Sequence, residues 1–150
     1  MRSKNWLLLI PIGLLILYSV GPNPKSPNYN NELPSVPADA LSLEKFVQIK
    51  ESMHKLRPDN QARIVWANDS LKQKTDYSIV YLHGFSASQG EGEPVHRQIA
   101  QQFGCNLYLS RLAEHGIDTS EQLVNLTTDQ YWESAKLAYC IGKQLGNNVI

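Results

Sequence analysis

The chain has 150 residues, and its 14 basic and 14 acidic side chains give it no formal net charge and a pI of about 6.9. It has no cluster or stripe of basic residues, which argues against a nucleic-acid partner. The length suits a single domain. Roughly the first forty residues lack the composition of a packed domain, so the folded part is expected to be smaller.

Residues 1–21 are predicted to be a targeting segment. Arg2 and Lys4 precede an apolar run from Trp6 to Val20. A basic start followed by an apolar run of this length is typical of a secretory signal, whereas a full membrane span needs about 20 apolar residues. Pro22 lies where a signal peptidase tolerates it poorly, which leaves both a cleaved signal and an uncleaved anchor open. We therefore expect a signal peptide or a membrane anchor, and an exported or membrane-anchored protein.

A linker and a helix are predicted next. Residues 22–38 are rich in proline and asparagine, which favours an extended, solvated tether. The domain is expected to span residues 39–150. It should begin with a helix from Asp39 or Ser42 that ends before Pro58. The helical spacing is set by Leu43, Phe46, Val47, Lys50, Met53 and Leu56.

The middle of the chain alternates strand and helix patterns. Residues 62–67 predict a strand in an early antiparallel part of the sheet, and Ile79 to Leu82 predict a fully buried strand. Residues 90–93 predict a mobile connection. A helix is expected from Pro94 to Gly104. The side chains expected to face the core from this helix are Val95, Ile99 and Phe103.

The last third of the chain continues this alternation. Residues 106–110 predict a buried strand, and Thr127 with Gln130 predicts a capping box at the start of a helix that ends at Gly146. The core-facing stripe of this helix is expected to be Tyr131, Ala135, Ala138 and Leu145. Residues 148–150 look like the opening of another strand.

The two cysteines and His54 carry side chains that could serve other chemistry. Cys105 and Cys140 could meet in an exported protein, or could be two small buried apolar residues, and the second interpretation is favoured. His54 has no partners at metal-ligand spacing, so it is expected on a solvated helix face. We expect no metal and no cofactor.

A functional loop is expected directly after the strand that ends at Leu82, where the chain breaks into His83-Gly84-Phe85. Ligands of open α/β sheets bind at the carboxyl ends of parallel strands. Glycine at this position lets the backbone approach a ligand closely. The strand that ends at Ser110 delivers residues 111–118 to the same edge of the sheet.

Three short motifs carry a resemblance to a known family. These are His83-Gly84-Phe85, the stretch Ser110-Arg111-Leu112-Ala113-Glu114-His115-Gly116, and Thr128-Asp129-Gln130-Tyr131-Trp132. In this order and spacing, over residues 62–150, they resemble the α/β-hydrolase superfamily, in particular bacterial carboxylesterases and monoacylglycerol lipases. The resemblance implies the N-terminal part of an α/β-hydrolase fold, with a mostly parallel sheet and helices on both faces. It also implies a serine hydrolase of small-molecule or lipid esters, in the bacterial periplasm or cell envelope.

The resemblance assigns roles to five residues. The backbone N–H of Phe85 would be a donor of the oxyanion hole, with Ser86 a less favoured neighbour. Gly84 would permit the turn, and His83 would order the loop. His115 would be either a wall of the acyl pocket or a loop residue bound to local backbone. Ser86 and His115 are therefore candidate substrate-binding residues.

The catalytic triad is not found in the sequence. No G-x-S-x-G motif occurs, and neither the acid nor the base can be placed. Residues 148–150 look like the strand that runs into the nucleophile elbow in this family. We therefore expect the N-terminal part of a serine hydrolase, which would be inactive alone. The alternative is a non-catalytic α/β-hydrolase-like domain.

Overall fold

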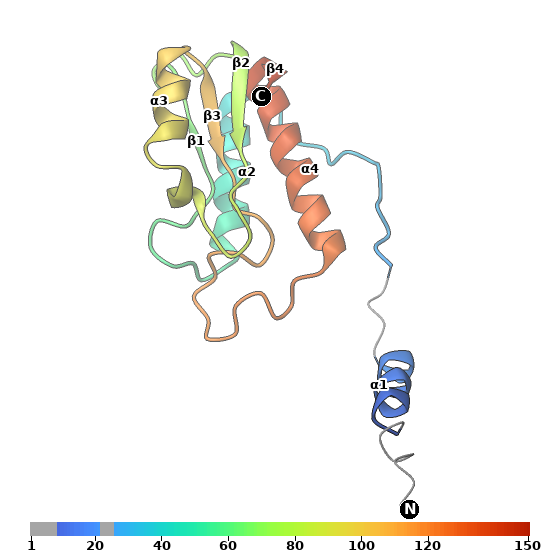
Figure 1. Cartoon of the computed structure of the whole chain (residues 1–150). Coiled ribbons are helices and arrows are strands. Elements are labelled where there is room, and N and C mark those ends of the chain that lie inside the picture. The colour runs from blue at the N-terminus through green and yellow to red at the C-terminus, as the bar shows by residue number, and fades with distance from the viewer. Residues whose placement is uncertain (1–8, 22–25) are drawn as a thin grey trace, which may run out of the picture.

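The computed structural model describes residues 9–21 and 26–150. The part from residue 40 onward contains one four-stranded sheet with helices on both faces (Figure 1). The strands are β1 (Arg63–Val65), β2 (Thr75–Tyr81), β3 (Asn106–Leu109) and β4 (Gly146–Val149). The helices are α1 (Leu9–Val20), α2 (Ala40–Ser52), the 3-10 helix η2 (Gln89–Gly92), α3 (Val95–Gln102) and α4 (Thr128–Leu145).

The sheet is mixed, with strand order β1-β3-β2-β4. β2 lies at its centre and runs parallel to both β3 and β4. β1 pairs with β3 in the antiparallel direction, as expected for residues 62–67. Parallel neighbours need crossover connections, which η2 with α3 and then α4 provide. The predicted α/β class, with a mostly parallel sheet between helices, is therefore confirmed.

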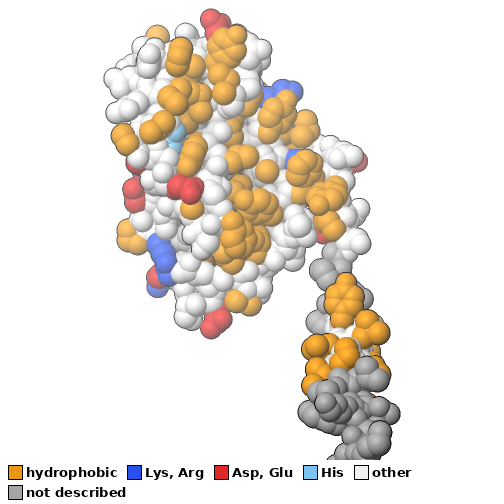
Figure 2. All heavy atoms as spheres, viewed as in Figure 1, with side chains coloured by type: hydrophobic (Ala, Val, Ile, Leu, Met, Phe, Trp, Pro, Cys, Tyr) orange, Lys and Arg blue, Asp and Glu red, His pale blue; other side chains and the backbone are white. Residues whose placement is uncertain are grey.

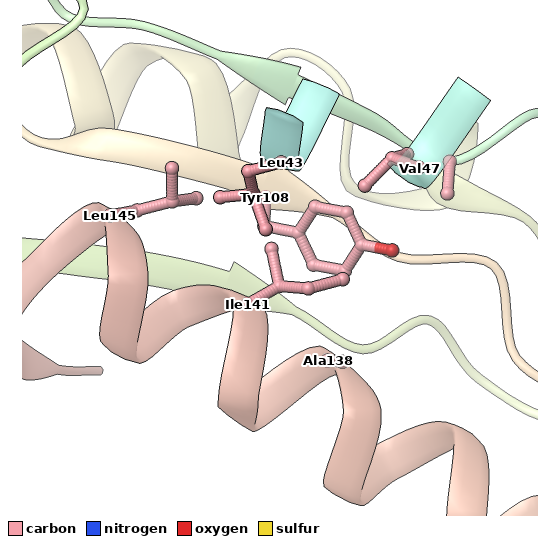
Figure 3. Packing of buried hydrophobic residues seen from close by; sticks show 7 residues of the cluster. Leu43, Val47, Tyr108, Ala138, Ile141 and Leu145 are labelled. Carbon is pink, nitrogen blue, oxygen red and sulfur yellow. The ribbon is translucent and has the colours of Figure 1, made fainter. Parts of the chain in front are cut away.

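One face of the sheet is covered by α2 and α4, and it holds the larger core (Figure 3). Asp39 caps α2 by accepting from the amides of Leu41 and Ser42, and the predicted capping box of Thr127 and Gln130 starts α4. These caps satisfy amides that a helix leaves free at its first turn. The buried core residues on this face are Leu43, Val47, Ala62, Tyr108, Ala138, Ile141 and Leu145.

The opposite face is covered by α3 alone, and here one prediction is wrong. Val95, Ile99 and Phe103 do not face the core, since they are 57%, 42% and 70% exposed. The buried residues of α3 are instead His96 and Ala100. The helix is therefore turned about its axis relative to the expected orientation.

Close approach and hydrogen bonding explain this orientation. The small Ala100 side chain lets α3 pack against Leu107 and Leu109 of β3. The His96 ring lies edge-on to Tyr81, with its Nε2 atom 2.9 Å from the carbonyl oxygen of Gln89. A larger side chain at position 100 would hold the helix away from the sheet.

The central strand is less buried than predicted. In β2 only Ser78 is fully buried, and its Oγ donates a 2.8 Å hydrogen bond to the Gly142 carbonyl of α4. The residues from Ile79 to Tyr81 are half-buried, and Leu82 is exposed. For Ile79 and Tyr81 the reason is that α3, with eight residues, covers only part of its face of the sheet, whereas Val80 faces the side of α2 and α4.

The apolar N-terminal segment forms α1, in which no residue is buried. Its 12 residues carry apolar side chains on the visible side (Figure 2). Residues 1–8 of the predicted targeting segment lie outside the described residues. Within residues 9–21 and 26–150, no helix combines the length and the apolar character that crossing a membrane requires.

The predicted linker is extended but is not simply a solvated tether. Residues 26–38 contain no helix or strand before the cap of α2, and residues 22–25 lie outside the described part. Three side chains of α4 hold this segment: Asp129 accepts from the Asn28 amide, while Trp132 and Lys136 donate to the Asn30 carbonyl. We call residues 28–36 the strap.

Both cysteines are buried and free, as the favoured interpretation expected. Cys105 precedes β3, and Cys140 lies within α4. They contribute small apolar side chains to the interior. His54 is exposed, also as predicted.

Candidate functional site

The candidate site lies where β2 and β3 end, at the edge of the sheet formed by their carboxyl ends. The register of the two strands pairs Tyr81 with Leu109. Just beyond it, Ser110 donates to the Tyr81 carbonyl from both its amide, at 3.2 Å, and its hydroxyl, at 2.6 Å. The two following loops, residues 82–88 and 111–118, therefore start side by side, as the sequence predicted.

His83 joins these two loops, consistent with the loop-ordering role expected for it. It is 3% exposed, and its Nε2 accepts from the Leu112 amide at 3.1 Å. Its Nδ1 lies 3.0 Å from the carbonyl oxygen of Gly84. Burial lowers the pKa of His83. The ring is therefore held neutral, with its proton on Nδ1 and its acceptor nitrogen in use.

His115 makes the reciprocal connection from the second loop. Its Nε2 accepts from the Ser86 amide at 3.1 Å, and its Nδ1 lies 2.7 Å from the Ala113 carbonyl oxygen. The ring is 2% exposed and lies 4.9 Å from that of His83, centroid to centroid. Both ring nitrogens of His115 are thus bound to local backbone, and neither is free to take a proton from a nucleophile.

In the first loop, three of the four backbone amides of residues 84–87 donate hydrogen bonds to described residues. The Gly84 amide donates to the Glu91 carboxylate at 2.7 Å, and the Ala87 amide donates to the Gly84 carbonyl at 3.1 Å. The Ser86 amide is held by His115. The Phe85 amide donates to no atom of the described residues. Among the amides of residues 84–87 it is therefore the one left without a partner in the described part of the chain, while the amides of His83 and Ser88 at the two ends of the loop also have none.

The backbone at this turn adopts an unusual conformation. Ser86 has a φ of 62°, in the left-handed region that side-chain-bearing residues seldom occupy. Such conformations cost about 1–3 kcal/mol and persist where the surroundings fix them. The fixing contact here is the bond from the Ser86 amide to His115. The Phe85 side chain is 71% exposed, so it does not anchor the turn in the core.

Two charged residues that the sequence did not single out support the site. Glu91 lies in η2, in a stretch predicted to be mobile, yet its carboxylate holds the Gly84 amide. Arg111 forms a buried ion pair with Glu51 of α2, at 2.8 Å, and donates to the His115 carbonyl at 3.2 Å. Their sequence signal is weak, because charged residues are usually solvated and only the fold brings these partners together.

A small polar cavity of about 170 Å³ adjoins the loops. Ser86 and His115 both line it, so the two candidate substrate-binding residues lie together. Other residues that line it are Arg57, Asn60, Ser88, Glu114 and Gln122. No hydroxyl here has a free histidine base, because the described contacts occupy both rings. Among residues 9–21 and 26–150, no group of His, Cys, Asp or Glu could hold a metal ion.

The fold and the site define an α/β protein with a fixed, hydrogen-bonded loop at the carboxyl edge of its parallel strands. Comparison with models of protein families, with curated proteins and with solved structures found no match.

Proposed function

We propose that this chain carries the oxyanion loop of a serine ester hydrolase, with the backbone N–H of Phe85 as a donor. One observation carries the proposal. In the loop that resembles the family, Phe85 is the residue to which the resemblance assigns the donor, and its amide has no partner among the described residues. The neighbouring amides of Gly84, Ser86 and Ala87 are all occupied.

Preorganisation gives this arrangement its chemical meaning. When a serine attacks an ester, the carbonyl oxygen becomes an oxyanion, and a fixed N–H donor lowers the barrier by about 3–4 kcal/mol. Glu91 and His115 fix the residues on either side of Phe85, so the donor needs no reorganisation as charge develops. Gly84 has no side chain on the approach to the loop, where an added Cβ would meet the Glu91 carboxylate at 3.0 Å.

The remaining catalytic groups must come from elsewhere in this proposal. Both ring nitrogens of His83 and of His115 are occupied by backbone groups, so neither histidine acts as the base of a triad. The nucleophile, acid and base would be supplied by residues outside these 150, with the serine in a strand-to-helix turn after β4. The substrate would be a small-molecule or lipid ester. The alternative, a non-catalytic hydrolase-like domain, would lack that serine.

We also propose that the N-terminal segment directs the protein to the bacterial periplasm or cell envelope. In support, α1 buries none of its apolar side chains against the described protein. Exposed apolar side chains on one helix favour an apolar environment such as a lipid surface. Fractionation of cells that express the protein with and without residues 1–21 tests this: removal should shift it from the envelope to the cytoplasm.

The test of the oxyanion role uses the natural protein, including whatever follows Ile150 in its reading frame. Phe85→Pro removes the N–H and should lower kcat on a p-nitrophenyl ester by about 100-fold or more. Phe85→Leu keeps the N–H and should lower kcat only modestly. Thermal unfolding and labelling by a fluorophosphonate probe are measured beside kcat, because proline also restrains the turn.

The outcomes separate the two classes of function. A folded Phe85→Pro protein with near-native kcat would show that the donor is assigned wrongly. A wild-type protein that takes no fluorophosphonate label and has no esterase activity would favour the non-catalytic domain. The 150-residue chain alone should show no turnover above a heat-treated control, because it supplies at most one oxyanion donor and no nucleophile.

A further inference from the structure

A second cavity, of about 200 Å³, lies between α2 and α4 on the face of the sheet away from α3. Phe46 and Val47 of α2 and Leu137 and Ile141 of α4 contribute apolar walls. It adjoins a wider groove of about 580 Å³, also lined by Phe46 and Leu137 and bounded by the strap. This cavity is distinct from the polar one beside Ser86.

Tyr108 of β3 brings a hydroxyl group to this cavity, whose walls are partly apolar and partly polar. The residue is 5% exposed, and its ring packs in the core between α2 and α4. Figure 3 shows its hydroxyl pointing away from the cluster of apolar side chains. The hydroxyl has no hydrogen-bond partner among the described residues. Burial, and then the Glu51 carboxylate, raise the pKa of Tyr108, so the hydroxyl keeps its proton and remains a donor.

Two other polar groups that line the cavity, the Glu51 carboxylate and the Ser134 hydroxyl, already accept hydrogen bonds from the protein. The Glu51 carboxylate accepts from Arg111 and from the Ala62 amide. Ser134 Oγ both accepts from the Ala113 amide and donates to a carbonyl. Lys50 is exposed, and its ammonium lies 5.5 Å from the centre of the Phe46 ring. The Glu114 carboxylate has no partner among the described residues. The Tyr108 hydroxyl is thus a donor at the cavity that no described protein group uses, and a ligand with an acceptor oxygen would match it.

The charges around the cavity favour a neutral ligand. Lys50 and Arg111 are balanced by Glu51 and Glu114, which all line it. The adjoining groove adds two further carboxylates, those of Asp129 and Glu133. An anionic head group would therefore meet no net positive charge. A carbonyl oxygen satisfies the tyrosine without the desolvation cost of a charge.

We propose that this cavity binds a neutral amphiphile, with its carbonyl oxygen accepting from Tyr108 and its aliphatic chain along Phe46 and Leu137. The Tyr108 hydroxyl exchanges a water molecule for the ligand oxygen, and the apolar walls exchange water for the chain. The proposal does not depend on the oxyanion assignment, since it uses another cavity and no catalytic step.

The test is a titration of the 150-residue chain with 2-octanone, followed by methyl NMR. Saturable shifts are expected at Val47, Leu137 and Ile141. Tyr108→Phe should weaken binding about five-fold, the loss that corresponds to one net hydrogen bond. Tyr139→Phe is the matched control: it removes the hydroxyl of an exposed tyrosine on α4 and should leave the affinity unchanged. Thermal unfolding confirms that both variants fold.

Several results would overturn the proposal. The first is an absence of saturable shifts. The second is a set of shifts confined to α1 or to Ile79, Ile99 and Ile150 on the other face of the sheet. The third is equal affinity for 2-octanone in the wild type and in folded Tyr108→Phe. Octanoate binding more tightly than 2-octanone would reject the neutral head group. A Leu137→Trp variant, which fills the cavity, should lose binding, and retained affinity in that variant when folded would also reject the site.

Discussion

The two faces of the sheet differ in how completely they are covered. On one face α2 and α4 bury a continuous core, which the strap extends. On the other face the eight residues of α3 leave Ile99 and Phe103 at the rim of an open apolar groove, beside Ile79 and Ile150. Successive side chains of β3 point to opposite faces of the sheet: Tyr108 lies in the core under α2 and α4, and Leu107 and Leu109 lie under α3. Stability should therefore depend mainly on the first face.

The largest expected effect tests this contrast with a matched pair of isoleucines. Ile141 of α4 is 1% exposed, and Ile99 of α3 is 42% exposed. Ile141→Ala should lower the free energy of unfolding by about 2–5 kcal/mol, because it leaves a cavity in a packed core. Ile99→Ala should change it by no more than about 0.5 kcal/mol. Urea denaturation measures both, and equal losses would contradict the contrast.

A smaller effect tests whether the strap belongs to the closed face. Lys136 is buried, and its ammonium donates to the Asn30 and Glu32 carbonyls at 2.6 and 2.7 Å. Lys136→Met keeps the apolar stem but loses these charge-assisted bonds, so it should cost about 1.5–3 kcal/mol. It should also make residues 26–38 more sensitive to limited proteolysis.

The control for the strap is Lys143→Met, at an exposed position of the same helix. This variant should unfold within about 0.5 kcal/mol of the wild type and leave the cleavage pattern unchanged. If Lys136→Met has the same small effect, the strap is not held by these contacts in solution.

The smallest effect concerns pH at the edge where the two loops meet. Burial lowers the pKa of His83 in the folded chain relative to its ordinary value near 6.5. At a pH between the pKa of His83 in the folded chain and its pKa in the unfolded chain, the unfolded chain binds more protons than the folded one. The free energy of unfolding should therefore fall as the pH drops below about 6.5 and level off below the folded pKa. Urea denaturation at several pH values measures this slope.

His83→Gln removes the titrating ring and should flatten that part of the profile. His54→Gln, at an exposed histidine, is the control and should leave the profile as in the wild type. A profile that is the same in the wild type and His83→Gln would show that other groups cause the acid sensitivity.

The sequence by itself determined most of the elements of this fold. Alternating strand and helix patterns placed the elements, and the family resemblance implied the α/β class. Local signals at Asp39, Thr127 and Gly146 placed helix ends that the structure confirms. The signals at Asp39 and Thr127 are readable because each side chain accepts from amides within three residues of itself, and the Gly146 amide closes α4 by donating to the Gly142 carbonyl. The sequence also placed the loop at Gly84 on the carboxyl edge of the sheet, next to the loop that carries His115.

Only the tertiary structure decided which side chains cover the two faces of the sheet and which hydrogen bonds hold the loop of residues 82–88. The orientation of α3 depends on the close approach of Ala100 to β3, which no periodicity in its own sequence encodes. Glu91 and Gly84 are seven residues apart, while His115 and Ser86 are 29 apart, so no local pattern predicts that these pairs bond. These two bonds occupy the amides on either side of Phe85. Local preference selects helices and strands, but long-range contacts determine which polar groups are left to act.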